Sequence, residues 1–408
     1  MAQSDTLAII KFMTDSAAND IEETRKVLFK KGVKTNFDSE RIIFSSVPSY
    51  KNHTSNIYTQ EANGLILELK TWKPLMVPAR SLRHNIDTDS ANKFLHQGLY
   101  HIYKIEDGTC FNMYFYNNRW VISTTRGYEM NNVKWEDKTY QELITECLAQ
   151  IPMTWEEFTN QLDKSRCYSF GFKHPEFHRF YYNGVPTYKI WFIQSVDLDS
   201  NSKFYLWSSS NSPVEQIKPQ ELYTEPVTSM RELYKMASNS LNNYLADKNK
   251  VCFGFILRSI NYEITKANSD LMVESSLMAT IRKFWYENET INLCHNEKWP
   301  KELVVTLFAY LNGSDYELFG MLFPQYQKTF EVYNNVIQNV IEKMLDIENV
   351  NTSTPEGKLA ENLLDSFKRS VKFTLKDREP AQQKRILYEY VIHPRNFQRL
   401  IVFFLGNN

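Results

Sequence analysis

The chain has 408 residues, of which 42% are hydrophobic, 23% charged and 14% aromatic, and its formal net charge is -1. This composition excludes a disordered or fibrous protein and predicts a globular chain of two or three domains. The absence of any apolar run near ~20 residues argues against a membrane span, and the five scattered cysteines argue against a disulfide framework or zinc site, so we expect a reducing, cytoplasmic compartment.

The N-terminal part predicts a helix followed by strands. Partial helical spacing of apolar residues predicts a helix over 5–31, and residues 40–60 read as strand plus loop. An apolar run predicts a strand over 64–69, which leads to a basic segment at 79–85. That segment is a candidate for phosphate contacts, with a solvated basic loop as the alternative.

Three strands are predicted next, over 100–105, 109–116 and 119–124, because β-branched and aromatic residues dominate these runs. Asn117 and Asn118 separate the last two, and asparagine tolerates the positive φ of a tight hairpin. A lysine, two carboxylates and a glycine lie where the first strand turns toward the second. Side chains at such a junction are exposed yet held by a sheet, which suits chemistry.

Helices and strands then alternate up to about residue 258. A helical region is predicted over 137–164, where Thr154 and Glu157 fit a capping box. Another helix is predicted from Ser229 to about Ala246 by a second box of this kind. Strands are predicted over 189–196, 203–208 and 252–258.

From about residue 288 the pattern becomes helical throughout, with candidates at 301–311, 316–346, 355–370, 378–392 and 397–405. Residues 368–399 contain nine lysines and arginines against three acidic residues, a net +6 on an otherwise acidic chain. Clustered positive charge of this kind could dock a phosphate backbone, while an ordinary solvated helical face is the alternative.

The run Lys104-Ile105-Glu106-Asp107-Gly108 resembles motif I, Lys-x-Asp-Gly, of the covalent nucleotidyltransferases. The closest resemblance is to phage-type RNA ligases, and Thr125-Arg126-Gly127 stands where their Thr-Arg-Gly-like turn would be. Here the motif is one residue too long, so counting back from Asp107 the nucleophile position holds Ile105. Because side chains alternate along a strand, Lys104 would point away from the pocket unless a bulge absorbs the offset.

The resemblance covers residues 60–290 in the expected order, with departures at the sites that hold metal and phosphate. Gly171 stands at a carboxylate position between Phe170 and Phe172, and Phe253 replaces the glutamate of motif IV. The lysine pair of motif V has no counterpart in 271–276.

The resemblance implies an α+β fold with an antiparallel-rich nucleotidyltransferase domain at 60–290. It is preceded by a helix and lead-in strands at 1–60 and followed by an all-helical domain at 291–408. It also implies roles for particular residues: Lys104 as catalytic nucleophile; Glu106 and Asp107 near a metal; Arg126, Arg258 and Lys266 at the nucleotide phosphates; Arg80, Arg83, Lys368, Arg369 and Lys372 on nucleic acid.

Three functions remain open. The first is a divergent RNA ligase that works through a lysyl-nucleotidyl intermediate with ATP or GTP and Mg2+. The second is a catalytically inactive nucleic-acid-binding protein, and the third a structural or assembly protein on the same fold. The offset motif and the losses at Gly171, Phe253 and motif V favour loss of ligase chemistry. RNA or another nucleic acid is the expected partner, and a large DNA virus is the expected source, with the virion as an alternative location.

Overall fold

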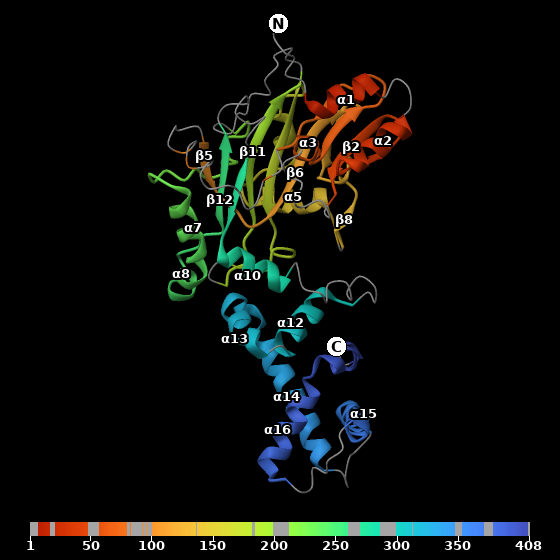
Figure 1. Cartoon of the computed structure of the whole chain (residues 1–408), viewed down its shortest axis with the longest axis vertical. Coiled ribbons are helices and arrows are strands. Elements are labelled where there is room, and N and C mark those ends of the chain that lie inside the picture. Colours follow the sequence, from red (N-terminus) through yellow and green to blue (C-terminus); the bar gives the residue numbers. More distant parts are fainter. Residues whose placement is uncertain are drawn as a thin grey trace. The chain divides into compact units, whose positions relative to one another are not determined.

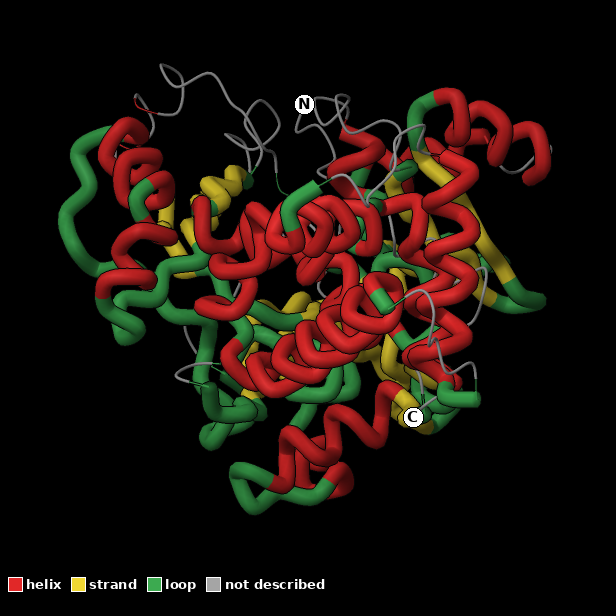
Figure 2. The backbone as a smooth tube through the Cα atoms, turned by 90° about the horizontal axis from the view of Figure 1, so that it is seen from below, coloured by secondary structure: helices red, strands yellow, loops and turns green. Residues whose placement is uncertain are grey.

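The computed structural model describes two compact units, Met1–Met278 and Ala279–Asn408. Figure 1 colours the chain from its N- to its C-terminus, and Figure 2 separates helices from strands by colour. The described residues are 7–16, 21–47, 57–79, 82, 92, 95, 100–135, 137–181, 184–198, 212–259, 270–285, 299–311, 313–346, 353–370 and 378–406. Outside them lie the predicted strand over 203–208 and the candidate residues Arg80, Arg83, Lys266 and Lys372.

The first unit begins with helices on a four-stranded antiparallel sheet, as Figure 1 shows in red and orange. The helix predicted over 5–31 is two helices in the structure, α1 (Ala8–Ser16) and α2 (Ile21–Lys30). A third, α3 (Ile57–Glu61), precedes the predicted strand at 64–69. In spatial order the strands are β1 (Val33–Phe37), β2 (Arg41–Ser46), β3 (Leu65–Glu68) and β4 (Pro74–Met76).

The central sheet is also antiparallel and contains the predicted hairpin. Asn117 and Asn118 have φ of 47° and 60°, which lets Tyr116 pair with Arg119 in a two-residue turn. In spatial order the strands are β11 (Lys189–Asp197), β10 (Arg166–Lys173), β6 (Thr109–Tyr116) and β7 (Arg119–Ser123). A small hairpin, β8 (Lys134–Trp135) and β9 (Lys138–Thr139), follows β7 in the chain.

Helices α5 (Tyr140–Ala149) and α6 (Trp155–Asn160) share an apolar cluster with the central sheet. The capping box predicted at α6 is present, because Thr154 Oγ1 accepts from Glu157 N at 3.2 Å and Glu157 Oε2 accepts from Thr154 N at 2.8 Å. The helical region predicted over 137–164 thus contains two short helices, α5 and α6.

A third antiparallel sheet completes this unit. In spatial order its strands are β13 (Leu271–Glu274), β12 (Gly254–Ser259) and β5 (Tyr100–Lys104). Helix α7 (Met230–Ser238) buries Met230 and Leu233 in one apolar cluster with these strands, and α8 (Ser240–Ala246) follows it. Helix α10 (Ser276–Trp285) begins in this unit and continues into the second. All strand pairs named here are antiparallel, as expected for an α+β fold.

The second unit is helical over its described residues. The helix predicted over 316–346 is interrupted at Pro324, where a proline cannot donate the backbone hydrogen bond that would continue it. The helices are α12 (Lys301–Leu311), α13 (Gly313–Leu322), η2 (Pro324–Tyr326), α14 (Gln327–Leu345), α15 (Pro355–Ser370), α16 (Pro380–Val391), η4 (Pro394–Asn396) and α17 (Phe397–Gly406). None of the helices among the described residues of the chain could cross a bilayer.

Candidate functional site

A cavity of about 360 Å3 lies between the central and third sheets, and we call it the intersheet cavity. Both sheets line it with residues from alternate strand positions, because neighbouring side chains of a strand point to opposite faces. The lining residues from the sheets are Cys110, Asn112, Ser169, Trp191, Ile193, Ile256, Arg258 and Met272.

The motif I lysine and the residue after it face different sides of the third sheet. The register of β5 against β12 runs without a break from Tyr100 to Lys104, and Ile105 N continues it by donating to Gly254 O at 3.0 Å. Ile105 is buried and lines the intersheet cavity. Lys104 pairs across the strands with Phe255, whose side chain belongs to the apolar cluster beside α7. The strand therefore has no bulge that would turn Lys104 toward the intersheet cavity.

Lys104 instead borders a second cavity, of about 810 Å3, on its own side of the sheet. There its ammonium forms an ion pair with Glu221, and the lysine side chain is 44% exposed. We call this space the outer cavity. Ile105 and Glu106 border both cavities, since they lie at the end of the strand that separates them.

The two carboxylates predicted near a metal already have basic partners. Glu106 Oε1 lies 2.7 Å from Lys189 Nζ, and Asp107 Oδ2 lies 2.6 Å from Lys173 Nζ. The second pair is enclosed, with Asp107 2% and Lys173 1% exposed, and burial lowers the pKa of Lys173. No cluster of three His, Cys, Asp or Glu side chains suited to a metal occurs among the described residues. Glu106 borders both cavities, whereas Asp107 borders neither of them. These two carboxylates therefore do not fit a shared metal site.

An indole occupies the position at which the resemblance implies a carboxylate. Gly171 on β10 pairs directly with Trp191 on β11. A Cβ on Gly171 would lie 2.2 Å from atoms of that indole, and one on Gly108 would lie 2.4 Å from it. A glutamate at position 171 would require the indole to move. The sequence carried no sign of this arrangement, because an aromatic residue in a strand is ordinarily a core residue.

Among the predicted phosphate contacts, Arg258 borders the intersheet cavity and Arg126 lies in an exposed turn. Arg258 is buried, and its Nη1 lies 3.2 Å from Asp270 Oδ2. Thr124 Oγ1 accepts from Gly127 N at 3.1 Å, which closes the turn that carries Arg126. The structure thus brings Arg258, but not Lys104, to the intersheet cavity.

Phe253, which stands at the position of the motif IV glutamate, is buried against Phe180, with ring centroids 5.6 Å apart.

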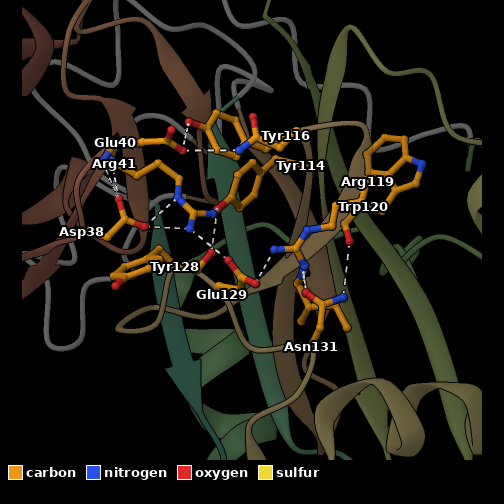
Figure 3. A network of polar contacts seen from close by, with 12 residues as sticks. Asp38, Glu40, Arg41, Tyr114, Tyr116, Arg119, Trp120, Tyr128, Glu129 and Asn131 are labelled. Atoms are coloured by element: carbon orange, nitrogen blue, oxygen red, sulfur yellow. Dashed lines mark hydrogen bonds and ion pairs between the residues drawn. The ribbon is translucent and has the colours of Figure 1, made fainter.

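A polar network holds Tyr128 and Glu129, which follow the turn at 124–127, as Figure 3 shows. Arg41 Nη2 lies 2.7 Å from Asp38 Oδ2 and 2.9 Å from Glu129 Oε2, and Arg41 Nη1 donates to Tyr114 Oη at 3.0 Å. Tyr114 Oη donates in turn to the backbone oxygen of Tyr128 at 2.6 Å. The network ties the first sheet to the central sheet. Its members are far apart in the sequence, so no local pattern indicated it.

Two of the predicted nucleic-acid contacts are described in the second unit. Lys368 and Arg369 lie exposed in the last turn of α15, and Arg369 Nε donates to Asp365 O at 3.2 Å. Elsewhere in the basic cluster, Lys384 lies 3.4 Å from Glu342.

No protein-family model matches the chain. Two tick isolates of African swine fever virus contain proteins named "Putative RNA-ligase" that are similar to it. The protein from Pretoriuskop, South Africa, is 28% identical over 328 residues, covering 74% of this chain and 71% of its own length. The protein from Malawi is 27% identical over 358 residues, covering 80% of this chain and 78% of its own length.

Solved ligase structures are also similar. A variant of the Naegleria gruberi RNA ligase with ATP and Mn has a TM-score of 0.31 and 12% identity, over 48% of this chain and 57% of its own. The "Putative ATP-dependent DNA ligase from Aquifex aeolicus" has a TM-score of 0.40 and 10% identity, over 74% and 75% of the two chains. By its sequence similarity the chain is a divergent relative of viral proteins named "Putative RNA-ligase", which confirms the expected resemblance to RNA ligases.

Proposed function

We propose that this chain is a divergent RNA-ligase-like protein that acts on or binds RNA and does not form a lysyl-nucleotidyl intermediate through Lys104. The observation that carries the proposal is the unbroken pairing of β5 with β12, with Ile105 at the intersheet cavity and Lys104 on the opposite face. The RNA-ligase name of the viral relatives supports RNA as the partner.

The chemistry of motif I explains why this geometry matters. Attack on a nucleotide phosphate requires a nucleophile with a lone pair, and the aliphatic side chain of Ile105 has none. The Lys104 ammonium forms its ion pair with Glu221 in the outer cavity, across the sheet from Arg258. Trp191 covers Gly171, so a carboxylate could not be accommodated there without rearrangement.

We expect no covalent nucleotide on this protein after incubation with ATP or GTP and Mg2+ or Mn2+. Intact-protein mass spectrometry should give the same mass before and after incubation, and Lys104→Ala treated in the same way should also keep its mass. An active RNA ligase incubated alongside establishes that the conditions support adduct formation. A mass increase of one nucleotidyl group that disappears in Lys104→Ala would overturn the proposal and make the chain an enzyme with ATP or GTP and Mg2+ as cofactors.

We expect the basic end of α15 to contribute to RNA affinity through phosphate contacts. Charge reversal in Lys368→Glu/Arg369→Glu should weaken binding of single-stranded RNA measured by fluorescence anisotropy. It should also reduce the slope of log affinity against log salt by about 0.7 for each phosphate that is no longer neutralised, because counterion release scales with the phosphates neutralised. The control Lys164→Glu/Lys328→Glu makes the same change in net charge at exposed lysines elsewhere. If both double variants alter the slope equally, the end of α15 is only a solvated face.

A further inference from the structure

The outer cavity is built on the face of the third sheet opposite the intersheet cavity. It lies between the adjoining ends of β5 and β12 and the helices α7 and α8, which lie beside these strands in Figure 1. Its volume of about 810 Å3 is within the roughly 300–1,000 Å3 range of small-molecule pockets. Tyr223, Met236 and Cys252 supply half-buried apolar surface to its wall.

The charges around the outer cavity balance each other. Three lysines and three glutamates line it, and four of these six residues form the ion pairs Lys104–Glu221 and Lys189–Glu106. Such a lining offers ammonium donors and carboxylate acceptors side by side without a net charge. It therefore suits an uncharged polar group that has both donors and acceptors better than it suits a polyphosphate.

Two contacts orient the ring of Tyr223 beside the lysines and glutamates of the outer cavity. The segment from Glu221 to Tyr223 runs along β5, since Lys104 N donates to Glu221 O at 2.9 Å and Tyr223 N donates to Ile102 O at 2.8 Å. Phe255 meets the Tyr223 ring edge-on with centroids 5.1 Å apart, and Tyr223 Oη donates to Glu225 at 2.8 Å. The aromatic wall is thus oriented before any ligand arrives, which lowers the cost of binding.

We infer that the outer cavity binds an unpaired nucleobase of single-stranded RNA. The base stacks on Tyr223, and Lys104 and Glu221 hydrogen-bond its polar edge. A fixed aromatic ring beside donors and acceptors is how proteins read splayed-out RNA bases. Lys250 is 69% exposed at the rim and lies 3.9 Å from Asp247, and it would exchange this exposed ion pair for the phosphate that stays outside. This inference rests on the proposed RNA binding and gives Lys104 a role in recognition.

The test compares variants of Tyr223 in the full chain, using a short single-stranded RNA with mixed sequence. Tyr223→Leu should weaken binding roughly 5- to 150-fold, the range expected for loss of one base–aromatic stack. Tyr223→Phe keeps the ring and should bind nearly as well as the parent protein. Lys104→Met should weaken binding roughly 2- to 12-fold, as expected for one hydrogen bond. Circular dichroism and thermal unfolding establish that each variant is folded.

A second measurement locates the base without any substitution. RNA that contains 4-thiouridine should photo-crosslink to peptides that carry Tyr223 or Cys252, and mass spectrometry identifies them. If the parent protein binds no RNA, both the proposed function and this inference fail. If it binds RNA but Tyr223→Leu and Lys104→Met bind equally well, or the cross-links all lie elsewhere, only this inference is overturned.

Discussion

Asp107→Ala is expected to destabilise the first unit by about 3–5 kcal/mol, the cost of removing one partner from a buried ion pair. Asp107 Oδ2 and Lys173 Nζ are 2.6 Å apart, and both side chains are at most 2% exposed. The substitution removes the carboxylate that compensates the buried ammonium. Because domains have only about 5–15 kcal/mol of stability, urea unfolding followed by tryptophan fluorescence should show a large shift in midpoint.

The neighbouring residue provides a matched control for Asp107→Ala. Glu106 also pairs with a lysine, but Lys189 is 43% exposed, so Glu106→Ala should cost no more than about 1 kcal/mol. Replacement of both buried charges in Asp107→Leu/Lys173→Met should recover most of the stability, because apolar residues carry no desolvation penalty. Equal destabilisation by Asp107→Ala and Glu106→Ala would show that burial of the pair is not what matters.

Acidification from about pH 6.5 to pH 4 is expected to cost on the order of 3 kcal/mol of stability. Burial lowers the pKa of His178 from 6.5 to about 4 in the folded chain, where Asp107, Lys173 and His174 surround it. Between these values the unfolded chain binds a proton that the folded chain does not, so stability falls as pH falls. A difference of about 2.5 in pKa corresponds to roughly 3 kcal/mol. Burial also lowers the pKa of His174, which acts in the same direction.

Unfolding free energies measured by urea titration at several pH values test this expectation. His178→Gln removes the titrating ring and should flatten the dependence between pH 6.5 and 4. His178 Nε2 lies 3.0 Å from Thr109 Oγ1, so the absolute stability of the variant should also fall. The test therefore compares the slopes of unfolding free energy against pH, and not the absolute free energies, of the parent protein and the variant. An unchanged slope would show that His178 is not the group responsible.

The sequence alone was sufficient for several features that short-range chemistry decides. Asn117 and Asn118 predicted the hairpin because few other residues accept positive φ, and Thr154 with Glu157 predicted the start of α6. The order of the motifs was sufficient to identify the resemblance to RNA ligases. A count of the residues in motif I left two directions open for the Lys104 side chain, and the unbroken pairing of β5 with β12 decided between them.

Only the tertiary structure decided which side chains share a space. Trp191 and Gly171 meet because the pairing of β10 with β11 places them opposite each other, and Lys173 reaches Asp107 from 66 residues away. Glu221 and Tyr223 join Lys104 because their segment runs along β5. Such contacts depend on long-range pairing and burial, which local propensity and periodicity do not encode. The sequence therefore determined most of the elements and the kinship of this protein, while the fold determined that Ile105 reaches the intersheet cavity and Lys104 borders the outer cavity alone.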